Sequence, residues 1–328
     1  MMWYGHFARY IFAIYLIIMK NYSKIFDYRI PKLLALSVGI FFLFSSPSYA
    51  QPTESSCTAQ FPNSQCIDNL NQILPKLKKA KVVYLGETHD SSQDHENQLK
   101  IIQELYQNNT RIAIGMEMFQ RPFQEVVNQY IAGKITEAEL IEKSEYKTRW
   151  GFDWELYAPI LRFAKEKNIP VLALNTPSEI TRKVARQGLE KLTNLEKQSI
   201  PPITEIRTDN LAYRQMILKA FEQHQSAGHG NSSSANRFFL AQVLWDETMA
   251  DGIAKFVNAN PDYQVVVLAG QGHIVYGYGI PSRVKRRIQE RNKGFSQLSV
   301  LLSVPEITPV EKDKPVADFI LNRNQSKN

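Results

Sequence analysis

Two tetrapeptides of this 328-residue sequence place a histidine three residues after a glycine, and each follows an apolar run. They are Gly86-Glu87-Thr88-His89 and Gly270-Gln271-Gly272-His273. A further carboxylate, Glu117, follows another apolar run. Imidazole and carboxylate groups together bind Mn, Fe, Co or Zn, and a metal with an open position turns bound water into a nucleophile. The pattern is typical of a divalent-metal site whose ligands are His89, His273, Glu87 and Glu117, or in which one glutamate acts as a general base.

The apolar runs before these residues predict a mostly parallel sheet flanked by helices. They are continuous rather than alternating, as in strands that are buried on both faces. Helical patterns at residues 92–107 and 155–168 separate them, which indicates an α/β fold with right-handed crossovers. Ligands of such sheets bind at the carboxyl ends of the strands, so we expect the acidic and imidazole side chains to converge there. The runs are Lys81–Leu85, Arg111–Met116, Pro170–Leu174, Gln264–Ala269 and Leu298–Leu302.

Two connections between these strands are much longer than a crossover requires. We interpret them as helical insertions, around residues 118–155 and 177–260, that build a cap over one end of the sheet. Together with the strands they give one α/β domain spanning residues 73–328.

Each candidate residue also has a purely structural explanation. Asp90 and Ser91 could cap the following helix and leave Glu87 and His89 as turn residues, and Gly270–His273 could be a glycine-rich turn. Glu117 is the exception: it lies between two methionines, where a buried carboxylate without a partner is costly, and this favours a functional role. It is their joint placement that favours a site.

Several neighbours of these residues have open roles. Arg121 could clamp an anion, act in catalysis beside Glu87 and Glu117, or form an ordinary ion pair. Asn175 ends the third strand and could support the site, and His95 could cap the helix or support a ligand. Tyr276 and Tyr278 could supply oxygen ligands or pack their glycine-rich loop. The run Arg283–Lys293 is a basic helix, explained either by a solvated face or by a patch for propionate or head groups.

The first 50 residues predict a signal peptide. A basic region precedes the apolar stretch Leu33–Phe44, and Ser48-Tyr49-Ala50 is typical of a cleavage site. Residues 1–18 could be an upstream extension, with Met19 as the start, and an uncleaved membrane anchor is the alternative. We therefore expect export across the inner membrane to a periplasmic or outer-envelope location. Five basic residues and one acid lie in this segment, so the net charge of +7 falls to +3 without it, which does not favour a nucleic-acid partner.

The polar segment 51–72 that follows is interpreted as a tether. It contains both cysteines of the chain, Cys57 and Cys66. In an oxidising compartment a disulfide between them is the simplest expectation, with a lipid-anchored cysteine as the alternative.

Six motifs of the sequence resemble, in order, those of the ChaN-like haem-binding uptake family of the Tiki superfamily. They are LGETHDSSQDHENQ, GMEMFQRPFQ, WGFDWELYAPIL, ALNTPSE, RFFLAQVLWDETMADGIA and VVLAGQGHIVYGYGIPSRV. The resemblance implies an EreA/ChaN-like α/β core with a helical cap, a secreted or lipid-anchored location and a role in haem or iron acquisition. Superfamily relatives with the same pattern are metal-dependent proteases or esterases. By that analogy Glu87, His89, Glu117 and His273 match active-site positions, and Arg121 matches an accompanying arginine.

Two functions follow as hypotheses. The first is a secreted haem-binding protein for haem or iron uptake, with haem bound under the cap or at the interface of a homodimer. The alternative is a metal-dependent hydrolase that cleaves peptides or esters at the strand ends. Association with a membrane is compatible with either.

Overall fold

The computed structural model describes residues 57–225, 232–289, 294–305, 311 and 313–322. The predicted signal peptide, the upstream extension and the first part of the tether lie outside these residues. Within the described chain no helix has the length and apolar character needed to cross a membrane.

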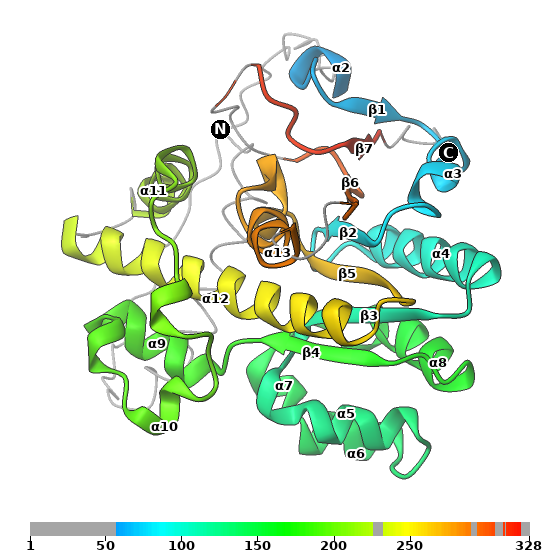
Figure 1. The fold of residues 1–328 in the computed structure, drawn as a ribbon, viewed down its shortest axis with the longest axis horizontal. Coiled ribbons are helices and arrows are strands. Elements are labelled where there is room, and N and C mark those ends of the chain that lie inside the picture. Colours follow the sequence, from blue (N-terminus) through cyan, green and yellow to red (C-terminus); the bar gives the residue numbers. More distant parts are fainter. Residues whose placement is uncertain (1–56, 226–231, 290–293, 306–310, 312, 323–328) are drawn as a thin grey trace, which may run out of the picture.

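The core of the fold is a parallel sheet of seven strands in the order β1-β7-β6-β2-β5-β3-β4 (Figure 1). The predicted α/β class is therefore confirmed, and the five predicted runs form the five neighbouring strands β6, β2, β5, β3 and β4 of this sheet. The strands are β1 (Gln65–Ile67), β2 (Val82–Glu87), β3 (Ile112–Gln120), β4 (Val171–Asn175), β5 (Gln264–Gly270), β6 (Gln297–Leu301) and β7 (Phe319–Leu321).

Helices cover both faces of this sheet (Figure 1). The α-helices are α2 (Cys57–Gln60), α3 (Leu74–Leu77), α4 (Ser92–Asn108), α5 (Gln124–Ile131), α6 (Glu137–Lys143), α7 (Tyr146–Arg149), α8 (Ala158–Glu166), α9 (Ser178–Gln187), α10 (Asn194–Lys197), α11 (Leu211–Gln225), α12 (Ser232–Ala259) and α13 (Ile280–Gln289). Short 3-10 turns are η1 (Leu70–Gln72), η2 (Arg121–Phe123), η3 (Trp154–Leu156), η4 (Leu189–Lys191), η5 (Ile203–Glu205), η6 (Gln271–His273) and η7 (Val275–Gly277).

The continuous apolar runs supply a separate core to each face. Along β2, Val83 and Leu85 pack with α4 and α8, whereas Val82 and Tyr84 pack with α12 and α13. Because successive side chains of a strand point to opposite faces, both sets must be apolar when helices cover both sides. The register pairs Glu87 with Gly270, which places the ends of β2 and β5 side by side.

The loop after β2 is closed by capping of α4. The Ser91 side chain accepts a hydrogen bond from the Asp94 backbone N–H (3.2 Å), and Asp94 Oδ2 accepts one from the Thr88 N–H (2.8 Å). The predicted cap is therefore present. It does not leave Glu87 and His89 in solvent, because both side chains are buried.

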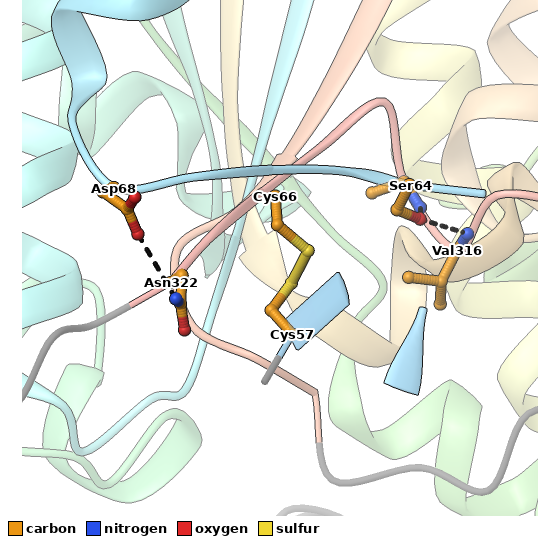
Figure 2. The surroundings of a disulfide bond; sticks show 7 residues. Cys57, Ser64, Cys66, Asp68, Val316 and Asn322 are labelled. Atoms are coloured by element: carbon orange, nitrogen blue, oxygen red, sulfur yellow. Dashed lines mark hydrogen bonds between the residues drawn. A yellow bond between two sulfur atoms is a disulfide. The ribbon is translucent and has the colours of Figure 1, made fainter. Parts of the chain in front are cut away.

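The segment that we interpreted as a tether is part of the fold from Cys57 onward, which corrects that interpretation. It forms α2 and β1, and β1 pairs with the C-terminal strand β7. Figure 2 shows the disulfide between Cys57 and Cys66, and the hydrogen bond that Ser64 Oγ accepts from the Val316 N–H at 2.9 Å. A three-residue strand in a polar segment gives no hydrophobic periodicity, so the sequence pattern did not indicate it.

The long connections contain helices, as expected, but not all of them form a cap. In the second connection, α9, α10 and α11 precede α12, and α12 packs along the sheet through residues such as Val243, Met249 and Ile253. Residues 232–259 are thus a flanking helix of the α/β layer rather than part of a cap.

Candidate functional site

Glu87, at the end of β2, is a fully buried carboxylate that accepts three hydrogen bonds. Its donors are His89 Nδ1 (2.8 Å), the Tyr157 hydroxyl (2.6 Å) and Gln98 Nε2 (2.5 Å). Burial alone would raise the pKa of Glu87. The hydrogen bond from His89 and the positive potential of His95 outweigh burial and lower that pKa below its ordinary value.

His95 completes this network from α4. Its Nε2 lies 3.0 Å from the His89 carbonyl oxygen, and its Nδ1 lies 3.1 Å from Gln98 Oε1 and 3.7 Å from Glu87 Oε2. The ring also contacts Tyr157 edge-on at 4.4 Å. His95 therefore supports the Glu87–His89 pair from behind, one of the two roles that the sequence left open.

A second buried group joins three elements. Glu117 on β3 lies with its Oε1 3.3 Å from His273 Nε2, and its Oε2 accepts a hydrogen bond from the Gly270 N–H at 2.8 Å. On the other side of the ring, His273 Nδ1 donates to Asp246 Oδ1 on α12 at 2.6 Å. The imidazole is thus held between two carboxylates, and the Tyr213 hydroxyl donates to the far oxygen of Asp246.

This arrangement fixes the charges of the group. Burial would lower the pKa of His273, but Glu117 and Asp246 outweigh it and raise the pKa to about 10. For Glu117 burial acts in the opposite direction, and His273 together with the Gly270 N–H lowers its pKa to about 2. Both shifts favour the charged forms of His273 and Glu117 at neutral pH.

The stability of the protein should depend on pH through this group. A histidine whose pKa rises from 6.5 to about 10 contributes stability that is fully present below pH 6.5 and is lost as the pH rises through about 10. We expect the free energy of unfolding, measured by urea titration between pH 7 and 10, to fall more steeply in the native protein than in His273→Gln. Parallel curves would contradict the assignment of charge to His273.

The two groups meet at one pocket at the carboxyl ends of the strands, which we call the strand-end pocket. His89 from one group and Glu117 from the other both line it, and the free volume inside it is about 30 Å³, which is room for one or two water molecules. The Trp150 and Phe152 rings pack against His89, with ring centroids 4.7 Å and 4.9 Å from the imidazole centroid. The lining residues are His89, Glu117, Gln120, Arg149, Trp150, Phe152, Asn175, Thr176, Ser178 and Trp245.

Other predicted residues have different positions. Asn175 lines the pocket and donates through Nδ2 to the Glu117 carbonyl oxygen at 2.9 Å. Arg121 does not line it, because its guanidinium pairs with Asp251 on α12 at 2.8 Å. Tyr276 and Tyr278 stack on each other with ring centroids 5.4 Å apart and pack in the core beneath α13. These contacts are the ones that the ion-pair and packing alternatives of the sequence analysis predict for the three residues.

The geometry does not favour a divalent metal. Among the described residues no group of three or more His, Cys, Asp or Glu side chains is placed to hold one. The reason is visible in the contacts. Both nitrogens of His273 face carboxylates, and the oxygens of Glu87 and Glu117 already accept protein hydrogen bonds.

Three functional candidates were missed by sequence reasoning. Asp246 holds His273, Tyr157 holds Glu87, and Arg149 at the pocket wall pairs with Glu179 at 2.8 Å. Asp246 and Tyr157 lie within the motifs RFFLAQVLWDETMADGIA and WGFDWELYAPIL, and Arg149 comes directly before the second. Their local sequence gave no sign of their roles, because it is the packing of α7, α12 and the turn before α8 that directs them to the strand ends.

Gly279 provides a test of how tightly His273 is held. A Cβ atom there would lie 2.2 Å from the His273 carbonyl oxygen and 3.0 Å from Asp246 Oδ1. We expect Gly279→Ala to lower the free energy of unfolding by about 3 kcal/mol, because backbone must move. The control is Gly277→Ala, where nothing lies within 4 Å and only the positive φ of 65° opposes a side chain. It should cost about 1 kcal/mol. Equal losses in urea titrations would contradict this packing.

The chain is an α/β protein with a parallel sheet, and paired acidic and imidazole side chains lie at the carboxyl ends of its strands. The chain belongs to the family described as "Haem-binding uptake, Tiki superfamily, ChaN", which matches residues 73–284. The resemblance indicated by the sequence motifs is thereby confirmed.

Two known proteins are similar to the chain. The solved structure titled "Cofacial heme binding to ChaN of Campylobacter jejuni" has a TM-score of 0.58 and 20% identity, covering 76% of this chain and 90% of that one. "Protein RETICULATA-RELATED 5, chloroplastic" of Arabidopsis thaliana is 28% identical in an alignment of 265 residues that covers 76% of this chain. The chain spans only 35% of the length of that plant protein.

Proposed function

We propose that the protein binds haem and acts in haem or iron uptake. The observation that carries this proposal is membership of the haem-binding uptake family over residues 73–284. The disulfide between Cys57 and Cys66 supports an oxidising compartment, in agreement with the expected export to the periplasm or outer envelope.

The four buried groups of the strand-end site do not fit a haem. Iron in haem takes one or two axial ligands from the protein. His273 is enclosed by Glu117 and Asp246 and is fully buried, and the two glutamates add negative charge rather than a further neutral donor. Haem binding is therefore proposed at a surface of the chain other than these four side chains, under the cap or between two copies.

A haemin titration tests this proposal. We expect a Soret band that saturates at a fixed haemin-to-protein ratio, and that persists in the double variant Glu87→Gln with His89→Ala. Slow transfer of the haem to an apo-globin would distinguish a specific site from loose adsorption. A band that never saturates, or transfer as fast as from free haemin, would refute haem binding.

A second candidate function is favoured by the Glu87–His89 pair. Glu87 accepts from Nδ1 of His89, an arrangement that orients an imidazole as a general base, and the ring lines a pocket with aromatic walls. We propose that this pocket hydrolyses an ester or a peptide. His89 would take a proton from water as the water oxygen bonds to the substrate carbonyl carbon, and would return the proton to the leaving group.

The hydrolytic proposal calls for a substrate panel. Chelator-treated protein should cleave esters or peptides, and His89→Ala should lower kcat/KM by about 100-fold or more. Tyr106→Phe, at the opposite end of α4, is the matched control and should retain full activity. Activity that appears only after Mn, Co, Fe or Zn is added would support the metal-dependent alternative, and activity unchanged by His89→Ala would refute the base.

A further inference from the structure

The basic helix α13 directs three arginines at one buried carboxylate. Glu247 on α12 is fully buried, and its oxygens are approached by Arg283 Nε (3.3 Å), Arg286 Nη2 (2.8 Å) and Arg287 Nη1 (2.7 Å). The Arg283 and Arg287 side chains are only 5% and 10% exposed, whereas that of Arg286 is 30% exposed. We call Arg283, Arg286 and Arg287 the arginine cluster.

Among the residues that the structure describes, the carboxylates near the arginine cluster do not balance its charge. Glu247 also accepts a hydrogen bond from the Arg207 N–H at 2.9 Å, so its oxygens are fully used. Glu205 Oε2 lies 3.4 Å from Arg287 Nη2, and Glu205 is nearly half exposed. In the described part of the chain, three guanidinium groups are thus set against two carboxylates, one of which is partly hydrated. An unbalanced buried charge costs several kcal/mol unless a counter-ion is supplied.

Buried N–H groups of the cluster also remain without hydrogen bonds to any described residue. They are Nε of Arg283 and both Nε and Nη2 of Arg287. Two of these atoms lie at ion-pair distance from a carboxylate, but without hydrogen-bond geometry. Buried donors are normally satisfied, and each unsatisfied one costs about 1–3 kcal/mol. Both the charge and the donors therefore point to an acceptor that is negatively charged.

We propose that the arginine cluster is a binding site for a small oxyanion, either a phosphate or a carboxylate group. Planar guanidinium groups match the oxygens of such anions in pairs, which a lysine cluster would not do. The partly exposed guanidinium of Arg286 provides access from solvent. This site is distinct from the strand-end pocket, because none of the three arginines lines that pocket. The two are connected through Tyr213, whose ring lies 5.2 Å from the Arg283 guanidinium and whose hydroxyl donates to Asp246.

The test uses the purified full-length protein at constant ionic strength. We expect 10 mM inorganic phosphate or 10 mM succinate, in place of chloride, to raise the melting temperature by about 3 °C, and calorimetric titration to give a saturable dissociation constant below about 1 mM. Phosphate alone acting would assign the site to a phosphate group, and succinate alone to a carboxylate. No saturable effect of either anion would overturn the proposal.

Two variants and one control locate the effect. Arg287→Met should weaken binding about tenfold or more, because a charged hydrogen-bond donor is lost. Arg286→Met, at the more exposed position, should do the same and serves where the buried variant does not fold. Arg111→Met removes an exposed ion pair with Asp262 and should leave binding unchanged. An anion effect that is retained in both cluster variants would place the site elsewhere and overturn the assignment.

Discussion

Replacing His273 with alanine is expected to lower the free energy of unfolding by about 3–5 kcal/mol. The imidazolium is fully buried between Glu117 Oε1 at 3.3 Å and Asp246 Oδ1 at 2.6 Å, so its removal leaves two buried carboxylates without their shared counter-charge. Few single substitutions cost this much, and the cause here is an uncompensated buried charge rather than lost packing area. Urea unfolding at pH 7 measures the loss.

The double variant His273→Ala with Asp246→Ala separates charge from packing. Removing Asp246 as well takes away one of the two unpaired carboxylates, so the double variant should be more stable than the sum of the two single losses. A double variant whose loss equals that sum would mean that the residues do not act as one group.

Removing the disulfide is expected to lower the free energy of unfolding by about 2–3 kcal/mol. Cys57 and Cys66 are nine residues apart, and the closed loop holds α2 against β1 at the edge of the sheet. The unfolded chain gains entropy when this loop opens. Urea unfolding of Cys57→Ser with Cys66→Ser measures the effect.

Reductant provides the matched control for the disulfide. The native protein in dithiothreitol should have the stability of the double serine variant, and the variant itself should not respond to dithiothreitol. Ser64→Ala, which removes only the hydrogen bond from the Val316 N–H, should cost about 1 kcal/mol. A double serine variant as stable as the native protein would show that the edge of the sheet does not depend on the covalent link.

The sequence predicted the centre of the fold because the signal there is strong. Continuous apolar runs predict β2 to β6, and the rule that ligands bind at the carboxyl ends of strands predicts that His89 and Glu117 lie at one pocket. The positions of such strands, and of the residues that directly follow them, can be predicted from the local sequence pattern and the topology of parallel sheets.

The remainder depends on packing that local sequence does not encode. Asp246 reaches the site from α12 and Tyr157 from the turn before α8, and how these elements lie on the sheet decides which side chains meet the strand ends. The metal prediction assumed that four side chains would share one centre. Instead each imidazole is paired with its own carboxylate, His89 with Glu87 and His273 with Asp246. The spacing of the motifs does not indicate a partner such as Asp246, which comes from a distant helix. Arg121 was matched by analogy, and its contact with Asp251 could not be inferred from spacing.

The pairing of β1 with β7 joins the two ends of the described chain, since Ile67 is in register with Leu321. β1 is synthesised long before β7, so this edge of the sheet can form only after Phe319–Leu321 has been made. The disulfide between Cys57 and Cys66 joins residues only nine positions apart and needs no part of β7, so it can close the N-terminal segment independently of this late pairing.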